Sequence, residues 1–195
     1  MMTKTHISVG CAVGLAVAKA LGMHPGPEYI TAIAIGSMLP DIDHPGSKIN
    51  RKILPRSKKI DKMAVYTIMA IVAGYLYLKN SNMGFALYTI PLFLMIAFSK
   101  HRGITHSILG SGIFIFSIYS ISNELGRGIL AIPFALGYLM HIVSDMLTSA
   151  GVQLFYPAKK RIKFLFRFKT NSTFEKVLMY IATAVSIYMG LQCIF

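Results

Sequence analysis

Histidine and aspartate side chains of this chain gather in four short clusters, and the clearest of them is His141 with Asp145. Because these residues are four apart, a helix would place them on one face, one turn from each other. Imidazole and carboxylate are good ligands for divalent first-row metal ions, so one helix could supply both. The structural alternative is a hydrogen-bonded His–Asp pair that joins two helices. Ionisable groups inside a bilayer are costly and functional by default, which favours metal ligation.

A second cluster holds three candidate ligands, Asp41, Asp43 and His44, between Pro40 and Pro45. Proline ends an apolar helix and restricts the turn that follows, which allows a compact loop with several ligands. The alternative is a polar helix C-terminus. Carboxylates are poor choices there, because the helix dipole favours cations at that end, and a bound cation would remove the objection.

The segment from His101 to His106 contains a third cluster. A spacing of five places the two imidazoles on different faces of a continuous helix, but Gly103 between them permits a break. Arg102 offers a forked donor that suits a phosphate or a carboxylate; its alternative interpretation is an ordinary basic residue beside a membrane span. His6 is the weakest candidate, because a lone histidine is more often structural.

The elements that must position these clusters are apolar. Hydrophobic residues make up 54% of the chain and charged residues 14%, against about 25% charged in a typical soluble domain. We therefore predict an all-α, polytopic integral membrane bundle, with about six to seven membrane-embedded helices in a single domain over residues 1–195. The expected segments are 5–21, 26–40, 63–79, 84–99, 106–122, 128–148 and 174–194. Proline interrupts the second and fourth, which are either full spans or short, tilted or re-entrant segments.

The formal net charge of +13 is distributed as membrane topology predicts. Seven basic residues lie between Lys48 and Lys62, and six between Lys159 and Lys169. Short basic loops beside spans are typical of the cytoplasmic face. Counting spans from these loops places all four clusters at the cytoplasmic face of the inner membrane, where they can converge, and puts His24 on the outer side, outside any site. We expect no nucleic-acid partner, because a basic patch alone supplies only non-specific affinity.

Two segments have two interpretations each. Phe and basic residues alternate between Arg161 and Lys169, which indicates either a short strand lying on anionic headgroups or a basic loop beside the membrane. The first twenty residues imitate a signal peptide that ends at Ala18-Lys19-Ala20. We expect a retained helix there, because Lys19 lies just before the cleavage position and no soluble mature domain follows.

Together the clusters offer more ligands than the three or four that one zinc ion needs. The predicted metal ligands are His6, Asp41, His101, His106, His141 and Asp145. We predict about one to three divalent ions, Zn²⁺ or alternatively Mn²⁺. Paired divalent ions suit phosphate-ester hydrolysis, because one activates water and both screen oxyanion charge. We expect whichever of Asp43 or His44 is not a ligand to act as general base, and Arg102 to hold the phosphate.

Four segments resemble, in this order, the motifs of bacterial and archaeal membrane-bound metal-dependent hydrolases, also described as LexA-regulated inner-membrane hydrolases. The segments are Thr5–His6, Leu39–Pro45, His101–Ser107 and Gly137–Val152. The order of ligands is also distantly similar to zinc-dependent phospholipase C, an all-α fold with a multi-zinc site. That likeness places ligands at His6, Asp41, His106, His141 and Asp145. The chain lacks the further downstream His and acidic ligands of that group.

The residues and the resemblance predict an integral membrane, metal-dependent hydrolase. Its expected substrate is a phosphoester in a membrane lipid or a lipid-linked molecule. One rival hypothesis is a proton or metal-ion transporter, because ionisable residues in spans also mark ion paths. Another is a membrane scaffold with a structural metal, which would have closed coordination by protein ligands. The sequence leaves the oligomeric state open.

Overall fold

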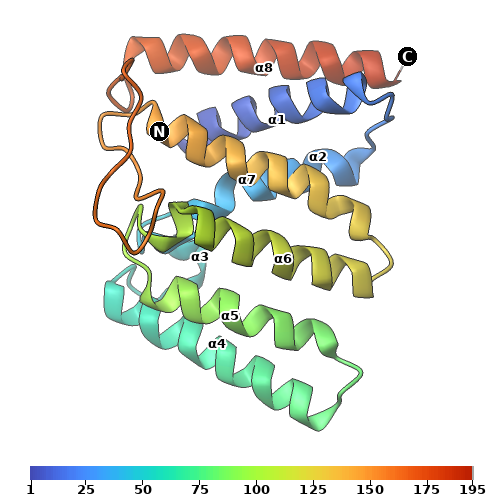
Figure 1. The fold of residues 1–195 in the computed structure, drawn as a ribbon, viewed down its shortest axis with the longest axis vertical. Coiled ribbons are helices and arrows are strands. Elements are labelled where there is room, and N and C mark those ends of the chain that lie inside the picture. Colours follow the sequence, from blue (N-terminus) through green and yellow to red (C-terminus); the bar gives the residue numbers. More distant parts are fainter. Residues whose placement is uncertain (195) are drawn as a thin grey trace. The chain divides into compact units, whose positions relative to one another are not determined.

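The computed structural model describes residues 1–194, and the surroundings of side chains 1–192. Within these residues the chain contains eight α-helices and no strand, so the predicted all-α class is confirmed (Figure 1). Each of the seven predicted apolar segments forms a helix. The elements are α1 (Thr3–Ala20), α2 (Pro27–Met38), η1 (Leu39–Asp43), α3 (Asn50–Ile53), α4 (Lys59–Lys79), α5 (Gly84–Phe98), η2 (Ile104–His106), α6 (Ile108–Glu124), η3 (Gly128–Leu130), α7 (Ala131–Met146) and α8 (Thr173–Ile194).

The chain divides into two compact units. The terminal unit comprises Met1–Pro40, Leu130–Val152 and Lys160–Phe195, and it holds α1, α2, α7 and α8. The central unit comprises Asp41–Ile129 and Gln153–Lys159, and it holds α3 to α6. Each unit contains two of the four His/Asp clusters, and the single domain remains a prediction.

In the terminal unit α7 packs against α1 and α2, and α1 packs against α8. Two glycines let α2 and α7 approach each other closely. A Cβ on Gly36 would lie 2.2 Å from the backbone oxygen of Phe134, and a Cβ on Gly137 would lie 2.2 Å from that of Ile33. Small residues at such crossings are the usual means by which membrane helices bring their backbones together. The close approach brings the backbone after Gly36 within reach of side chains on α7.

In the central unit α5 packs against both α4 and α6. Pro91 lies inside α5, which nevertheless runs unbroken from Gly84 to Phe98. The buried Lys62 of α4 donates to the backbone oxygens of Asp43 and Ser99, both at 2.8 Å. One ammonium group therefore joins the end of η1 to the turn after α5, the two places where this unit carries its candidate His and Asp ligands.

Three helical segments are long and apolar enough to cross a membrane: Lys59–Lys79, Gly128–Met146 and Thr173–Gln192. The shorter helix Gly84–Phe98 is also apolar. The strand interpretation of Arg161–Lys169 is wrong. Ile162 and Phe168 make only isolated β-bridges, with Val152 and Thr148, and the segment is a loop. Alternation of side chains makes a strand only where a neighbouring strand continues the hydrogen bonding, and here the partner segment is a turn.

Candidate metal-binding clusters

The terminal cluster consists of His6 on α1 with His141 and Asp145 on α7. All three side chains are buried, and the two imidazole rings stack with their centroids 3.7 Å apart. Nε2 of His6 lies 3.4 Å from Oδ1 of Asp145, and ligand atoms of His141 and Asp145 lie within 4.8 Å of each other. The i, i+4 spacing thus brings His141 and Asp145 to one face of α7, as predicted, and α1 adds the third residue.

A backbone carbonyl orients His141. Its Nδ1 lies 2.7 Å from the oxygen of Ser37, the residue after Gly36 at the α2–α7 crossing. A carbonyl oxygen only accepts, so Nδ1 carries the proton and Nε2 offers a lone pair. This is the outer-shell arrangement that fixes the tautomer of metal-binding histidines. Ser37 carries no recognisable signal in the sequence, because any residue could supply the carbonyl.

The fit of a metal ion to this cluster can be tested on His6. Both of its ring nitrogens are buried and have no hydrogen-bond partner among the described residues. A buried polar atom without a partner is costly, and a metal ion bound to one of the two nitrogens would remove that cost for that atom. Two imidazoles and one carboxylate are also a donor set that catalytic zinc sites use. The amino group of Met1 donates to Oδ1 of Asp145 at 3.0 Å, so a metal ion that binds this oxygen would have to displace that amino group or overcome its charge.

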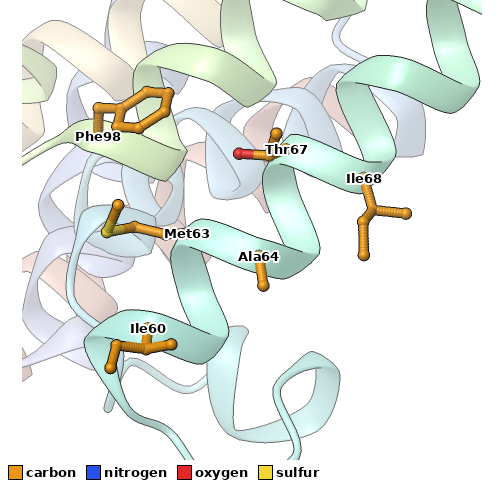
Figure 2. A pocket seen from close by; sticks show the side chains of 6 residues that line it. All are labelled: Ile60, Met63, Ala64, Thr67, Ile68 and Phe98. Carbon is orange, nitrogen blue, oxygen red and sulfur yellow. The ribbon is translucent and has the colours of Figure 1, made fainter.

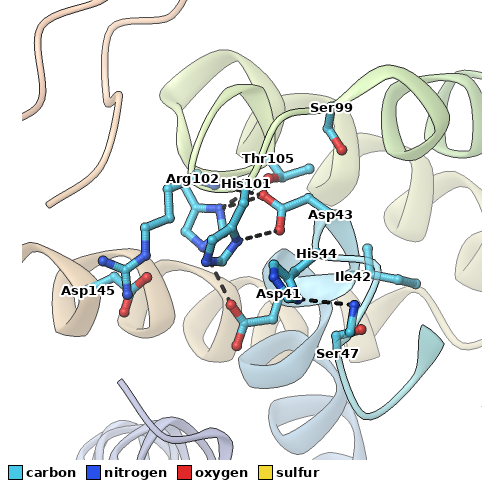
Figure 3. A network of polar contacts seen from close by, with 12 residues as sticks. Asp41, Ile42, Asp43, His44, Ser47, Ser99, His101, Arg102, Thr105 and Asp145 are labelled. Atoms are coloured by element: carbon cyan, nitrogen blue, oxygen red, sulfur yellow. Dashed lines mark hydrogen bonds and ion pairs between the residues drawn. The ribbon is translucent and has the colours of Figure 1, made fainter. Parts of the chain in front are cut away.

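The central cluster is organised around the buried carboxylate of Asp43 (Figure 3). Oδ1 lies 2.8 Å from Nδ1 of His101, and Oδ2 accepts from the backbone N–H of Arg102 at 2.9 Å and from the Thr105 hydroxyl at 2.6 Å. Nδ1 of His106 lies 3.4 Å from Oδ2 and 3.0 Å from the Thr105 hydroxyl. Both imidazoles thus turn Nδ1 toward acceptors, which leaves Nε2 of each ring for a metal ion.

The charge state of Asp43 follows from these neighbours. Burial alone would raise the pKa of its carboxyl group. The charge of His106 and hydrogen bonds from His101 and His106 outweigh that effect and hold the pKa of Asp43 well below its usual range. The carboxylate therefore stays ionised and acts as an acceptor for its neighbours. The hydrogen bonds of Asp43 favour a role in positioning the two histidines. The general-base role of Asp43 stays a prediction.

Asp41 supplies a second carboxylate to the central cluster. Its Oδ1 lies 3.9 Å from Nε2 of His106, and its side chain is 21% exposed. Two ligands about 2.1 Å from a tetrahedral zinc ion are about 3.4 Å apart, so a small closure would let both bind one ion. His44 is exposed; its Nδ1 accepts from the backbone N–H of Gly46, and its ring meets that of His101 edge-on with centroids 4.9 Å apart.

Arg102 connects the central cluster to the segment Gln153–Lys159. Its backbone has φ +60°, an uncommon value for a residue other than glycine, and its carbonyl accepts from the N–H of Gln153 at 3.2 Å. Strained backbone that persists in a fold often marks a functional site. Ser107 caps α6 by accepting from the N–H of Gly110. The hydroxyl of Thr105 belongs to the Asp43 network.

The structure therefore assigns the predicted residues to two groups. His6, His141 and Asp145 meet in the terminal unit. The central unit brings together Asp41, Asp43, His44, His101, Arg102 and His106. Convergence of all four clusters at one membrane face stays a prediction. The sequence did not predict the supporting roles of Ser37 and Lys62. Lys62 could be recognised from the sequence only as a basic residue beside a membrane span.

Comparison with known proteins places this chain in a family. Residues 1–194 match the model of the YdjM inner membrane protein family, and the chain belongs to that family. It is 28% identical to the uncharacterized protein YvsG of Bacillus subtilis (strain 168), over 96% of this chain and 93% of that protein. It is 26% identical to the inner membrane protein YdjM of Escherichia coli (strain K12), over 84% of this chain and 69% of that protein. No solved structure matches the chain.

Proposed function

We propose that this protein is a metal-dependent hydrolase of the inner membrane that cleaves a phosphoester in a lipid or lipid-linked substrate. The observation that carries the proposal is the orientation of its histidines. His141 turns Nδ1 to a backbone carbonyl, and His101 and His106 turn Nδ1 to the Asp43–Thr105 network. His141 and His106 are buried and His101 is exposed. Imidazoles held with Nε2 available in this way are organised as metal ligands, and a pair that only joins two helices would not need this orientation.

Each cluster contains the same donor set. Two imidazoles and one carboxylate come from His6, His141 and Asp145 in one unit, and from His101, His106 and Asp41 in the other. Three protein ligands leave a position open on a zinc ion, as catalytic sites require. A bound divalent ion would supply an acidified water and stabilise negative charge on a phosphoryl oxygen. We expect about one to three ions, Zn²⁺ or Mn²⁺.

The residues of the chain itself have separate tasks in this proposal. Asp43 and Ser37 hold imidazoles in the metal-binding tautomer. The exposed ring of His44, next to His101, would take a proton from an attacking water once its Nδ1 gives up the hydrogen bond from Gly46. Arg102 would pair with a phosphate, for which a guanidinium is well suited.

The proposed location is the cytoplasmic side of a multi-pass protein. Membership of an inner membrane family and three helices of spanning length support the membrane location. The cytoplasmic face rests on the basic loops at 48–62 and 159–169.

The test begins with metal analysis of the protein purified in detergent. We expect at least one tightly held divalent ion, reduced in His141→Gln and in His101→Gln. The variant His24→Gln, which changes an exposed histidine outside both clusters, should keep the wild-type content. A wild-type protein that neither retains nor binds zinc or manganese would refute the proposal.

Activity separates the hydrolase from its rivals. Phosphatidic acid and phosphatidylglycerol in mixed micelles should be turned over, EDTA should abolish the turnover, and added Zn²⁺ or Mn²⁺ should restore it. Tight metal binding without turnover of any lipid phosphoester would favour a structural metal. Proton or metal flux into liposomes without turnover would favour a transporter.

A further inference from the structure

An apolar groove runs along the first half of α4, where the C-terminal end of α5 meets it (Figure 2). Its lining residues are Ile60, Met63, Ala64, Thr67, Ile68 and Phe98. Ile60 and Ile68 are 76% and 58% exposed. The eight helical steps from Ile60 to Ile68 span about 12 Å, close to the depth of one leaflet in a hydrocarbon core of about 30 Å. The groove thus has the polarity and the length of a site for an acyl chain.

A cavity of about 340 Å³ lies in the same unit, between the turn that follows α5 and the segment Gln153–Lys159. Its polar lining includes the side chains of Lys100, Lys159, Gln153 and Tyr156. Among residues 1–192, no carboxylate lies within ion-pair distance of Lys100 or Lys159. The cavity therefore carries two positive charges without a protein counter-charge, which favours an anion.

Phe98 lines both the groove and the cavity. The apolar groove and the cationic cavity therefore adjoin at this one side chain, which is 62% exposed. Lys100 and Gly103 line the cavity, and in the chain they flank His101 and Arg102 of the central cluster. A ligand with an apolar chain at one end and an anionic group at the other would fit the apolar groove and the adjoining cationic cavity.

We propose that the central unit binds one anionic phospholipid, with an acyl chain in the α4 groove and its phosphate headgroup in the cavity between Lys100 and Lys159. Any exposed face of a membrane helix meets acyl chains, so the groove alone would select no lipid. The charged cavity at its end supplies the selection, because it disfavours a zwitterionic headgroup relative to an anionic one. That this lipid is also the substrate rests on the proposed function; its binding does not.

The absence of tryptophan from the chain gives a direct assay. Ala64→Trp places the single tryptophan in the groove, where lipids with brominated acyl chains would quench its fluorescence. In nanodiscs, brominated phosphatidylglycerol should quench this introduced tryptophan at a lower mole fraction than brominated phosphatidylcholine does. Tyr180→Trp on α8, at a position where the side chain is 68% exposed, is the reference and should be quenched equally by both lipids.

Charge variants in the Ala64→Trp background identify the headgroup site. Lys100→Gln with Lys159→Gln should reduce the preference for phosphatidylglycerol by about fivefold per lysine, the usual effect of one basic side chain near anionic lipid. Lys48→Gln with Lys52→Gln removes the same charge from exposed positions of the same unit outside the cavity, and should leave the preference intact.

Equal quenching by the two lipids, or an equal loss of preference in both double variants, would overturn the proposal. The measurements are made in EDTA, so they need neither a metal ion nor turnover. Preferential binding by a protein that hydrolyses no phosphoester would support this site and refute the hydrolase. Turnover of lipid phosphoesters without preferential quenching would support the hydrolase and refute this lipid site.

Discussion

Replacing Asp43 by asparagine should remove metal binding from the central cluster without removing a ligand. The two side chains have the same shape, but the carboxylate accepts at both oxygens and the carboxamide at only one. Oδ2 faces two donors, and one of them, the backbone N–H of Arg102, can only donate. The amide oxygen will therefore occupy this position, and the amide NH₂ will face Nδ1 of His101, 2.8 Å away in the wild type.

The size of the effect follows from this hydrogen bonding. Two donors cannot face each other, so Nδ1 of His101 must become an acceptor and the proton must move to Nε2, which then cannot bind a metal ion. His106 also loses the negative charge beside its Nδ1. Loss of an outer-shell partner typically weakens metal binding 10- to 100-fold, and here one ligand is disabled as well. We expect the upper end, about 100-fold or about 2.7 kcal/mol of binding free energy.

Competition with a chelator of known zinc affinity measures the change, and long-range ¹H–¹⁵N spectra of the histidine side chains report the tautomers. Asp61→Asn is the matched control. Asp61 is also buried in the central unit, but it pairs with Arg56 at 3.2 Å and contacts no histidine. Wild-type zinc affinity in Asp43→Asn, with the proton of His101 still on Nδ1, would refute the reasoning. A comparable loss in Asp61→Asn would show a general effect of removing a buried charge.

Three further predictions concern the supports of the clusters. Gly137→Ala should lower the Tm in detergent by about 2–12 °C, because the added Cβ would clash with helix backbone; Gly112→Ala, where nothing lies within 4 Å, should not lower the Tm, because alanine favours the helix. Lys62→Met should weaken zinc binding by the central cluster about tenfold although Lys62 is not a ligand, and Lys59→Met, at an exposed position, should have no effect in the same titration. The pKa of Asp43 is lowered by folding, so its contribution to the stability of the metal-free protein is complete above about pH 5 and is lost as the pH falls further. Asp43→Asn should therefore reduce the fall in Tm between about pH 5 and about pH 3. An unchanged slope of Tm against pH would contradict the lowered pKa of Asp43 in the folded protein.

The helices, and the spacing of candidate ligands along one helix, could be predicted from the sequence, because both are local properties. Hydropathy identified every long helix, and the i, i+4 spacing placed His141 and Asp145 on one helix face. The roles of Asp41 and Asp43 could not be separated in this way. Both lie in the same short segment between prolines, and the difference arises from the donors around Asp43, which come from residues 58 to 62 positions later in the chain. Such partners are set by how helices pack.

The two clusters carry the same donors but different supports, and this difference predicts the order in which they take up metal. A carboxylate behind an imidazole raises the basicity of the ligand more than a neutral carbonyl does. Asp43 lies behind both imidazoles of the central cluster, whereas His141 of the terminal cluster has the carbonyl of Ser37. The amino group of Met1, 3.0 Å from Asp145, adds a positive charge that a metal ion must overcome or displace.

Zinc should therefore fill the central cluster first and leave it last. In a titration of metal-free protein, the first equivalent should be lost in His101→Gln, and His141→Gln should affect only the weaker uptake that follows. A rising concentration of chelator should remove the ion that depends on His141 before it removes the ion that depends on His101. If either variant abolishes all uptake, the clusters do not load independently and share their ions. In that case the hydrogen-bond partners behind the individual histidines do not set the zinc affinity of each cluster. Such a result would instead support the prediction from the membrane topology that the clusters converge.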